Sequence, residues 1–133
     1  MTTERYRIVK KLGEGGWGRT YLVRDRKLGK LWAMKEWKEQ ESAEADADRE
    51  RRREEEFRIL RELDSPCFPR LVECFQEGGK RYLVMDWIRG TTLEERLISG
   101  GAFPWREAAS HAVLLCGALE KHHGRKPPIL HLD

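Results

Sequence analysis

Short apolar runs separated by glycines and charged residues fill the first 37 residues of the chain. Residues 6–12 and 19–24 are rich in β-branched and aromatic side chains, and glycines lie between them. This pattern predicts a hairpin of two antiparallel strands. A turn at residues 27–30 leads into a third run of the same kind, residues 31–37, which predicts a third strand.

A charged helix is predicted next. The segment from about 41 to 63 is dominated by Glu, Asp, Arg and Ala and contains neither Gly nor Pro, and Asp-Ser-Pro at 64–66 ends it. Residues 48–58 resemble a basic nucleic-acid arm, but their opposite charges cancel. We therefore expect a solvated helix face on which Glu54 and Arg58 form an ion pair.

Two strands and two helices are predicted in the remainder of the chain. The strands lie around 71–75 and 81–88, joined by Glu-Gly-Gly-Lys at 77–80. Residues 92–98 form a short helix, and Phe-Pro begins an apolar-rich helix over 104–123. This order of elements predicts an α+β fold, with an antiparallel sheet that carries one helix, followed by helical material.

Composition and charge exclude several classes of protein. The 133 residues suit one domain, and 26 basic against 23 acidic residues give a net charge of +3. Both signs are interspersed, so no basic face for nucleic acid is expected. No apolar run approaches the roughly 18 residues of a membrane span, and the N-terminus lacks a signal peptide. We expect a cytoplasmic protein without a nucleic-acid or membrane partner.

The three cysteines, Cys67, Cys74 and Cys116, are scattered and have no histidine at metal-ligand spacing. An odd number in this arrangement argues against a disulfide framework and against a zinc site. We expect buried thiols in a reducing compartment.

A glycine-rich loop, Gly-Glu-Gly-Gly-Trp-Gly at residues 13–18, fits the pattern G-x-G-x-x-G. Glycines let backbone N–H groups approach phosphate oxygens, as in a dinucleotide-binding turn or a kinase loop, although a ligand-free hairpin fits the loop alone. A dinucleotide-binding fold needs a helix directly after the glycines, whereas a strand is predicted from Arg19 onward. Lys35, on the third predicted strand, lies 17 residues after the last of these glycines.

The charged helix offers a partner for this lysine. Glu56 shares one helix face with the apolar Ile59, Leu60 and Leu63. A carboxylate on the apolar stripe of a charged helix faces the sheet and needs a buried cation, for which Lys35 is available. The alternative is that Glu56 only borders the stripe.

The loop, the lysine and the helix glutamate, in this order, resemble the protein kinase family, particularly bacterial serine/threonine kinases. Residues 65–71 resemble the turn into the family's fourth strand, residues 82–88 its fifth strand and hinge, and residues 122–133 the approach to its His-Arg-Asp catalytic loop. The resemblance implies a kinase N-lobe, a five-stranded antiparallel sheet plus one long helix, over residues 1–88. It implies the hinge and the first helices of a truncated C-lobe over residues 89–133.

The resemblance also implies ATP as a ligand and a role for each matching residue. Lys35 would contact the α- and β-phosphates and pair with Glu56, and Asp133 would be the base that orients the substrate hydroxyl. Met85 would be the gatekeeper, and Thr20 stands where the family usually has Val. The nucleotide contacts implied for the loop, the adenine slot and the hinge are Leu12, Gly13, Glu14, Gly15, Gly16, Trp17, Gly18, Arg19, Thr20, Ala33, Lys35, Met85, Asp86 and Ile88.

Two departures from the family pattern change the expectation. Leu132 replaces the Arg of His-Arg-Asp, which pairs with a phosphorylated activation loop in the family. The sequence ends at Asp133, so the Asn and Asp-Phe-Gly that hold Mg²⁺ in the family do not occur, and no metal ligand is expected in this segment. We therefore expect a fragment or a naturally truncated kinase domain that is inactive alone.

Two functions follow from the sequence. The first is ATP- and Mg²⁺-dependent phosphorylation of Ser or Thr in an unidentified protein substrate. The alternative is a non-catalytic, kinase-like interaction module. A reading frame that continues into the Asn and Asp-Phe-Gly segments would favour the first function.

The predicted helix over 104–123 points to a further partner. In the family this helix packs into a helical lobe, most of which is missing from this sequence, so its apolar stripe exceeds what soluble monomers usually expose. We expect a homodimer through this helix. The stripe consists of Ala108, Ala109, Ala112, Val113, Leu115, Cys116 and Leu119.

Overall fold

The chain divides into two compact units, Met1–Ile88 and Arg89–Asp133. A computed structural model describes residues 4–16, 18–37, 51, 54–55, 57–59, 61–62 and 66–125.

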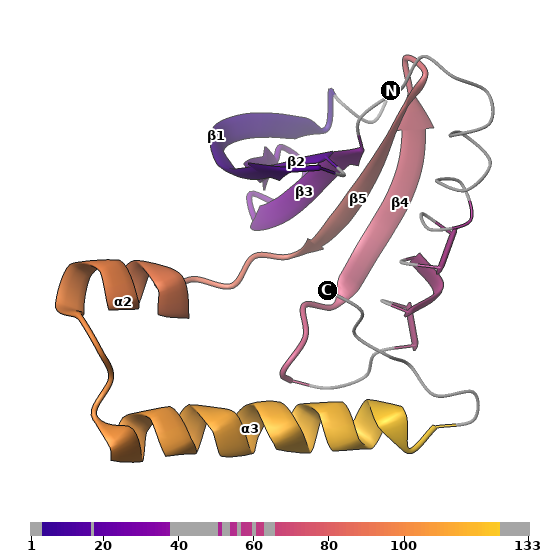
Figure 1. The fold of residues 1–133 in the computed structure, drawn as a ribbon. Helices are drawn as coiled ribbons and strands as arrows, with labels where there is room; N and C mark the ends of the chain where they lie inside the picture. Colours follow the sequence, from indigo (N-terminus) through magenta and orange to yellow (C-terminus); the bar gives the residue numbers. More distant parts are fainter. Residues whose placement is uncertain are drawn as a thin grey trace. The chain divides into compact units, whose positions relative to one another are not determined.

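The first unit is built on a five-stranded antiparallel sheet with the order β1-β2-β3-β5-β4 (Figure 1). Its strands are β1 (Tyr6–Gly15), β2 (Gly18–Asp25), β3 (Leu31–Trp37), β4 (Leu71–Glu77) and β5 (Lys80–Asp86). Every strand overlaps the segment predicted for it, so the predicted five-stranded antiparallel sheet is confirmed.

Glycines make the tight turn between β4 and β5. Gly78 and Gly79 have φ angles of +60° and +79°. A two-residue hairpin turn of type I′ requires positive φ at both positions, which glycine adopts without steric cost. The pair of glycines therefore sets the register of the β4–β5 hairpin.

One face of the sheet carries an apolar core drawn from all five strands. Side chains at alternate positions meet across the strands, as in the row formed by Tyr21, Met34 and Val84. The Phe75 ring stacks on Tyr82 with 5.0 Å between centroids. This cluster consists of Tyr6, Val23, Met34, Tyr82 and Val84, with Tyr21, Trp32 and Phe75 packed against it. The opposite face also buries apolar side chains, namely Leu22, Ala33, Trp37 and Leu83.

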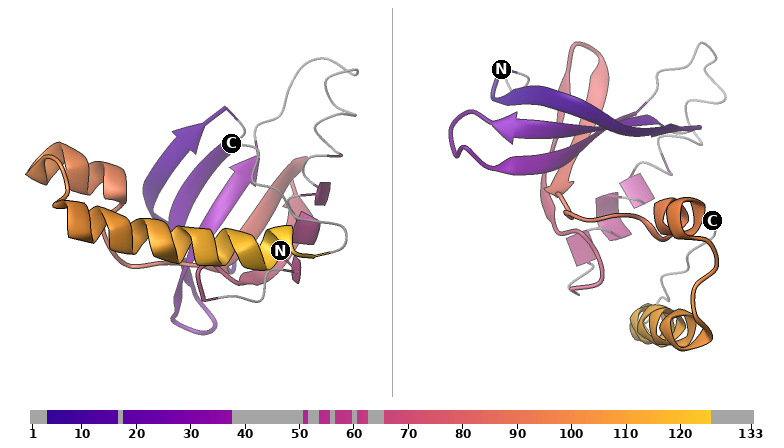
Figure 2. Two further views of the ribbon diagram at one scale, coloured as in Figure 1. Left: turned by 60° about the horizontal axis from the view of Figure 1, so that its bottom comes forward. Right: turned by 90° about the vertical axis from the view of Figure 1, so that its left-hand side faces the viewer.

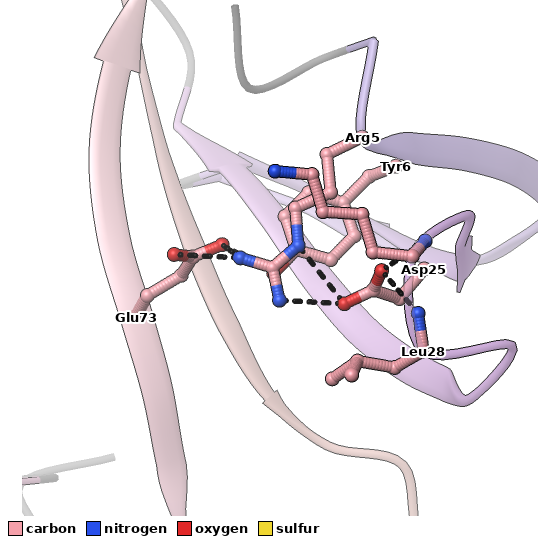
Figure 3. A network of polar contacts seen from close by, with 6 residues as sticks. Arg5, Tyr6, Asp25, Leu28 and Glu73 are labelled. Carbon is pink, nitrogen blue, oxygen red and sulfur yellow. Dashed lines mark hydrogen bonds and ion pairs between the residues drawn. The ribbon is translucent and has the colours of Figure 1, made fainter.

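A buried carboxylate holds the start of β1 against the turn that follows β2 (Figure 3). Asp25 is fully buried. Its carboxylate accepts hydrogen bonds from Arg5 Nη2 at 2.6 Å and Nε at 3.0 Å, and from the N–H groups of Lys27 at 2.8 Å and Leu28 at 3.1 Å. The hydrogen bonds from Arg5 keep the pKa of Asp25 below its ordinary value despite burial.

The same arginine reaches the edge strand β4. Arg5 Nη1 lies 3.3 Å from a carboxylate oxygen of Glu73, and the Tyr6 hydroxyl donates a hydrogen bond to the same carboxylate. The network of Arg5, Tyr6, Asp25 and Glu73 thus ties β1, β2 and β4 together at the edge of the apolar core.

The predicted charged helix is helical at every described residue between 51 and 62. The charged side chains among these described residues are exposed, as predicted, but the expected ion pair between Glu54 and Arg58 is wrong. Arg58 instead pairs with Glu55 at 2.5 Å and with Glu62 at 3.7 Å. Positions three apart on a helix are also neighbours, and here Glu55 competes successfully for the guanidinium.

The second unit contains two helices, α2 (Leu93–Gly100) and α3 (Trp105–His123), close to the predicted ranges. Figure 2 shows α3 along its length and end-on. Thr92 and Glu95 form a capping box that fixes the start of α2, because each side chain accepts a hydrogen bond from the other residue's N–H. No helix in the described ranges is long and apolar enough to cross a membrane.

The predicted burial of the three thiols is wrong, because Cys67, Cys74 and Cys116 are all exposed. Cys74 lies on β4, which is an edge strand of the sheet, at a position whose side chain points away from the core. Partial desolvation nevertheless raises the pKa of the Cys74 thiol. Cysteine's general preference for burial therefore did not predict these positions.

Replacing the buried carboxylate tests the role of the network. Asp25→Asn removes the charge that Arg5 binds but keeps the size of the side chain. We expect the free energy of unfolding in urea to fall by about 2 kcal/mol, because the carboxylate accepts four hydrogen bonds in a buried site.

The matched control is Glu55→Gln, which removes an exposed partner of an arginine and should change stability by less than about 0.5 kcal/mol. Because the pKa of Asp25 is lowered by folding, its contribution is complete above the unfolded pKa of about 3.9 and is lost as pH falls through the lower, folded pKa. As pH falls through the acid range, the free energy of unfolding should therefore decrease more steeply for the wild type than for Asp25→Asn. Equal slopes in this range, or equal losses in the two variants, would contradict this role.

Candidate functional site

The sheet places four predicted site residues on the face opposite the apolar core. Thr20 on β2 lies directly across from Lys35 on β3, and Ala33 on β3 lies directly across from Met85 on β5. Side chains alternate along each strand, and paired residues share a face. Three strands therefore bring Thr20, Ala33, Lys35 and Met85 together on one face.

The glycine-rich loop is the end of the β1–β2 hairpin. Gly13 pairs with Thr20, and Gly15 pairs with Gly18. A Cβ added at Gly13, Gly15 or Gly16 would meet nothing within 4 Å, and none of these glycines has a positive φ. Within the described residues, neither packing nor backbone conformation requires glycine at these three positions. Close approach of a ligand to the backbone would require it.

Gly18 differs from the other loop glycines. A Cβ at this position would overlap the carbonyl oxygen of Glu36 and would lie 3.2 Å from Cα of Trp37. Glycine is therefore required here because the start of β2 approaches the end of β3 closely beside the glycine-rich loop.

The charged side chains of the loop pair with one another. The Glu14 carboxylate lies 3.1 Å from Lys11 Nζ and 3.2 Å from Arg19 Nε. These groups are solvated, so the pairs contribute little stability. Two cations against one carboxylate leave these three side chains with a net charge of +1, which together with the backbone N–H groups of the loop suits an anionic ligand.

Lys35 is half-buried on the sheet face that it shares with Thr20, Ala33 and Met85, here called the site face. Its Nζ atom lies 5.9 Å from the centroid of the Trp37 ring, within range of a cation–π interaction. Its predicted partner Glu56 lies outside the described residues, as do Trp17 and Asp133.

The predicted adenine slot and hinge combine buried and exposed positions. Ala33 is buried, Thr20 and Met85 are half-buried, and Leu12 and Ile88 are exposed. An exposed Ile88 side chain is compatible with the expected contact, which uses its backbone.

Asp86 is anchored by an arginine that sequence reasoning missed. Arg70 Nε donates to the Asp86 carboxylate at 2.9 Å, and the Asp86 N–H donates to the Arg70 carbonyl oxygen at 3.0 Å. The hydrogen bond from Arg70 lowers the pKa of Asp86. The side chain is therefore engaged within the N-terminal unit.

A second missed ion pair lies next to the site lysine. Lys80 Nζ lies 3.0 Å from the Glu36 carboxylate and links β3 to the start of β5. The two residues are 44 positions apart, and no local pattern signals such a contact.

Comparison with known proteins assigns the family. A family model described as protein kinase domain matches residues 6–133. The chain belongs to the protein kinase family. This kinase chain is 31% identical over 132 residues to the serine/threonine-protein kinase Nek1 of Mus musculus, covering 98% of this chain and 11% of that protein. It is 32% identical over 138 residues to the serine/threonine-protein kinase C of Synechocystis, covering 100% of this chain and 25% of that protein.

A second bacterial relative gives the same result. A probable serine/threonine-protein kinase of Clostridium perfringens is 30% identical over 129 residues, covering 97% of this chain and 18% of that protein. The kinase chain thus spans a quarter or less of these relatives. The sheet and the helices that follow it have the fold of a kinase N-lobe and the start of a helical C-lobe, as predicted.

The surroundings of two loop glycines predict different effects when each is replaced by alanine. Gly18→Ala should lower the free energy of unfolding by about 1–3 kcal/mol, because the added methyl group overlaps the β3 backbone. Gly15→Ala is the matched control and should change stability by less than about 0.5 kcal/mol, because its methyl group enters open space. Thermal unfolding of both variants measures the difference. Equal stability losses would show that the β2–β3 approach is wrongly placed.

Proposed function

We propose that this chain carries the nucleotide-binding half of an ATP-dependent serine/threonine protein kinase, which transfers phosphate to hydroxyls of a protein substrate. The observation that carries the proposal is the open space above Gly13, Gly15 and Gly16, on a hairpin that leads directly to Lys35. A cytoplasmic location belongs to the same proposal.

Different site residues would bind different parts of the nucleotide. The loop N–H groups and the Lys35 ammonium would offset the charge of the phosphates, which is the main requirement of phosphoryl transfer. Leu12, Thr20 and Ala33 would line the adenine slot, with Met85 as the gatekeeper and the Asp86 carbonyl and Ile88 backbone at its edge. Glu56 would pair with Lys35, and Asp133 would orient the substrate hydroxyl.

The described residues do not fit a magnesium site. They contain no group of three His, Cys, Asp or Glu side chains that could hold a metal ion. The sequence of residues 1–133 also contains no Asp-Phe-Gly, which holds Mg²⁺ in the kinase family. We therefore assign no step to Mg²⁺ and propose that residues 1–133 bind ATP weakly without turnover.

Removing the site lysine tests the binding role. With residues 1–133, Lys35→Met should weaken ATP binding about tenfold or more and leave adenosine binding within twofold, because only the phosphates use the ammonium. Calorimetric titration of both ligands measures this. The matched control is Lys27→Met, which removes an exposed lysine from the β2–β3 turn.

Three results would count against the proposal. Unchanged ATP affinity in Lys35→Met would remove the lysine from the site, and phosphoryl transfer by residues 1–133 would refute their inactivity. If the wild type binds neither ATP nor adenosine, the alternative of a non-catalytic interaction module is favoured.

A homodimer through the helix over 104–123 is a second part of the proposal. Val113, Leu114 and Leu115 on α3 are 72%, 65% and 56% exposed, and Ile98 on α2 is 80% exposed. Ala118 on α3 is buried and is therefore excluded from the contact. Apolar side chains exposed to this degree favour association, at about 25 cal/mol for each Å² buried.

The dimer is tested by sedimentation velocity at tens of micromolar. We expect a species of about twice 15.7 kDa, and a monomer for the double variant Val113→Lys, Leu114→Lys. Glu120→Lys changes charge at another exposed position of the same helix and should leave the dimer intact. A wild-type chain that sediments as a single species near 15.7 kDa would contradict the proposal.

A further inference from the structure

Asp86 is the last residue of β5, and its contacts with Arg70 differ from an ordinary rung of an antiparallel sheet. In a hydrogen-bonded pair of such a sheet, each N–H donates to the carbonyl oxygen of the opposite residue. The Asp86 N–H does donate to the Arg70 carbonyl oxygen, at 3.0 Å. The Arg70 N–H instead donates to the side chain of Asp86, at 3.3 Å from the carboxylate oxygen Oδ2.

The Arg70 side chain holds the carboxylate in this position. Its Nε atom donates to the same Oδ2 atom at 2.9 Å, and its Nη2 atom lies 3.5 Å from Oδ1. The Arg70 side chain is 77% exposed, so this ion pair adds little to the stability of the fold. Its consequence is local, because the carboxylate takes the N–H that would otherwise complete the rung.

The backbone carbonyl of Asp86 is therefore left for another donor. The N–H and the carbonyl of one strand residue engage the same neighbouring strand, and the Asp86 N–H engages Arg70 rather than Trp32 of β3. Residues 87–92 form neither helix nor strand, so no further rung follows. Asp86 also directly follows Met85, which lies on the site face beside Ala33. This carbonyl thus belongs to the edge of the proposed adenine slot.

Adenine carries one group that suits this carbonyl. In a nucleoside, the 6-amino group holds the only N–H donors of the adenine base. Purine riboside is the same nucleoside without the amino group, so it keeps the ring and the ribose but offers no donor. A neutral hydrogen bond of this kind contributes about two- to tenfold to an affinity. The two nucleosides therefore measure this single contact.

We propose that the Asp86 carboxylate is a positioning group that binds the N–H and the guanidinium of Arg70 and so keeps the Asp86 carbonyl open to the adenine 6-amino group. This inference rests on the proposed nucleotide-binding function. It gives the site a preference for adenine over purines that lack the amino group, and it assigns that preference to a side chain that does not touch the nucleotide.

The experiment measures the affinities of residues 1–133 for adenosine and purine riboside by NMR titration. For the wild type we expect adenosine to bind about fivefold more tightly. In Asp86→Ala the Arg70 N–H is released to pair with the carbonyl of residue 86, so the preference should fall below twofold. Purine riboside should bind within twofold of the wild type, because the rest of the slot is unchanged.

The matched control is Asp86→Asn. Its side-chain amide oxygen can still accept the Arg70 N–H, so this variant should retain the wild-type preference for adenosine. Both variants should fold, because the ion pair that they change is exposed.

The possible failures are distinguishable. A wild-type preference for adenosine that persists in Asp86→Ala would overturn the inference and leave the nucleotide site in place. An equal loss of preference in Asp86→Asn would also overturn it, because the charge of the carboxylate would then be responsible. A wild type that binds both nucleosides equally would show that the carbonyl does not contact the amino group. If the wild type binds neither nucleoside, the proposed function fails, and the inference fails with it.

Discussion

The register between β2 and β3 is the constraint on which the site depends. It places Thr20 opposite Lys35, and a slip of one residue would turn the lysine to the core face of the sheet. Gly18 allows the two strands to approach closely at the loop, where any larger residue would overlap the Glu36 carbonyl. The Lys80–Glu36 ion pair joins the same end of β3 to β5. The geometry of the candidate phosphate site therefore originates in backbone packing between strands.

The opposite end of the sheet is held by a polar network rather than by a turn alone. Asp25 is buried but accepts four hydrogen bonds, two of them from Arg5, so its charge is compensated. Arg5 also reaches Glu73, which connects the start of the fold to an edge strand. This network lies on the same face as the cluster around Met34, whereas Lys35 lies on the opposite face, where Leu22 and Leu83 are also buried.

Local patterns predicted the strands, the helices and the two-glycine turn at 78–79, because alternation and positive φ are properties of short segments. The Arg5–Asp25–Glu73 network and the Arg70–Asp86 pair were not predictable in this way, because their partners lie 16 to 68 residues apart. The predicted burial of the cysteines failed because residue type alone does not say where a side chain lies: Cys74 is on the outer side of an edge strand and Cys116 is at an exposed position of α3. The face shared by Ala33 and Lys35 was predictable from alternation, whereas its pairing with Thr20 and Met85 needed the register.

The central claim is that the loop glycines Gly13, Gly15 and Gly16 form one nucleotide-binding face with Thr20 and Lys35, which pair across β2 and β3. The most direct measurement is the change in backbone amide NMR shifts when ATP is added to residues 1–133. We expect the largest changes at Gly13, Gly15, Gly16 and Thr20, with small changes at residues whose side chains lie on the core face, such as Val84. Shift changes confined to the core face or to α3, with the loop amides unperturbed, would contradict the claim.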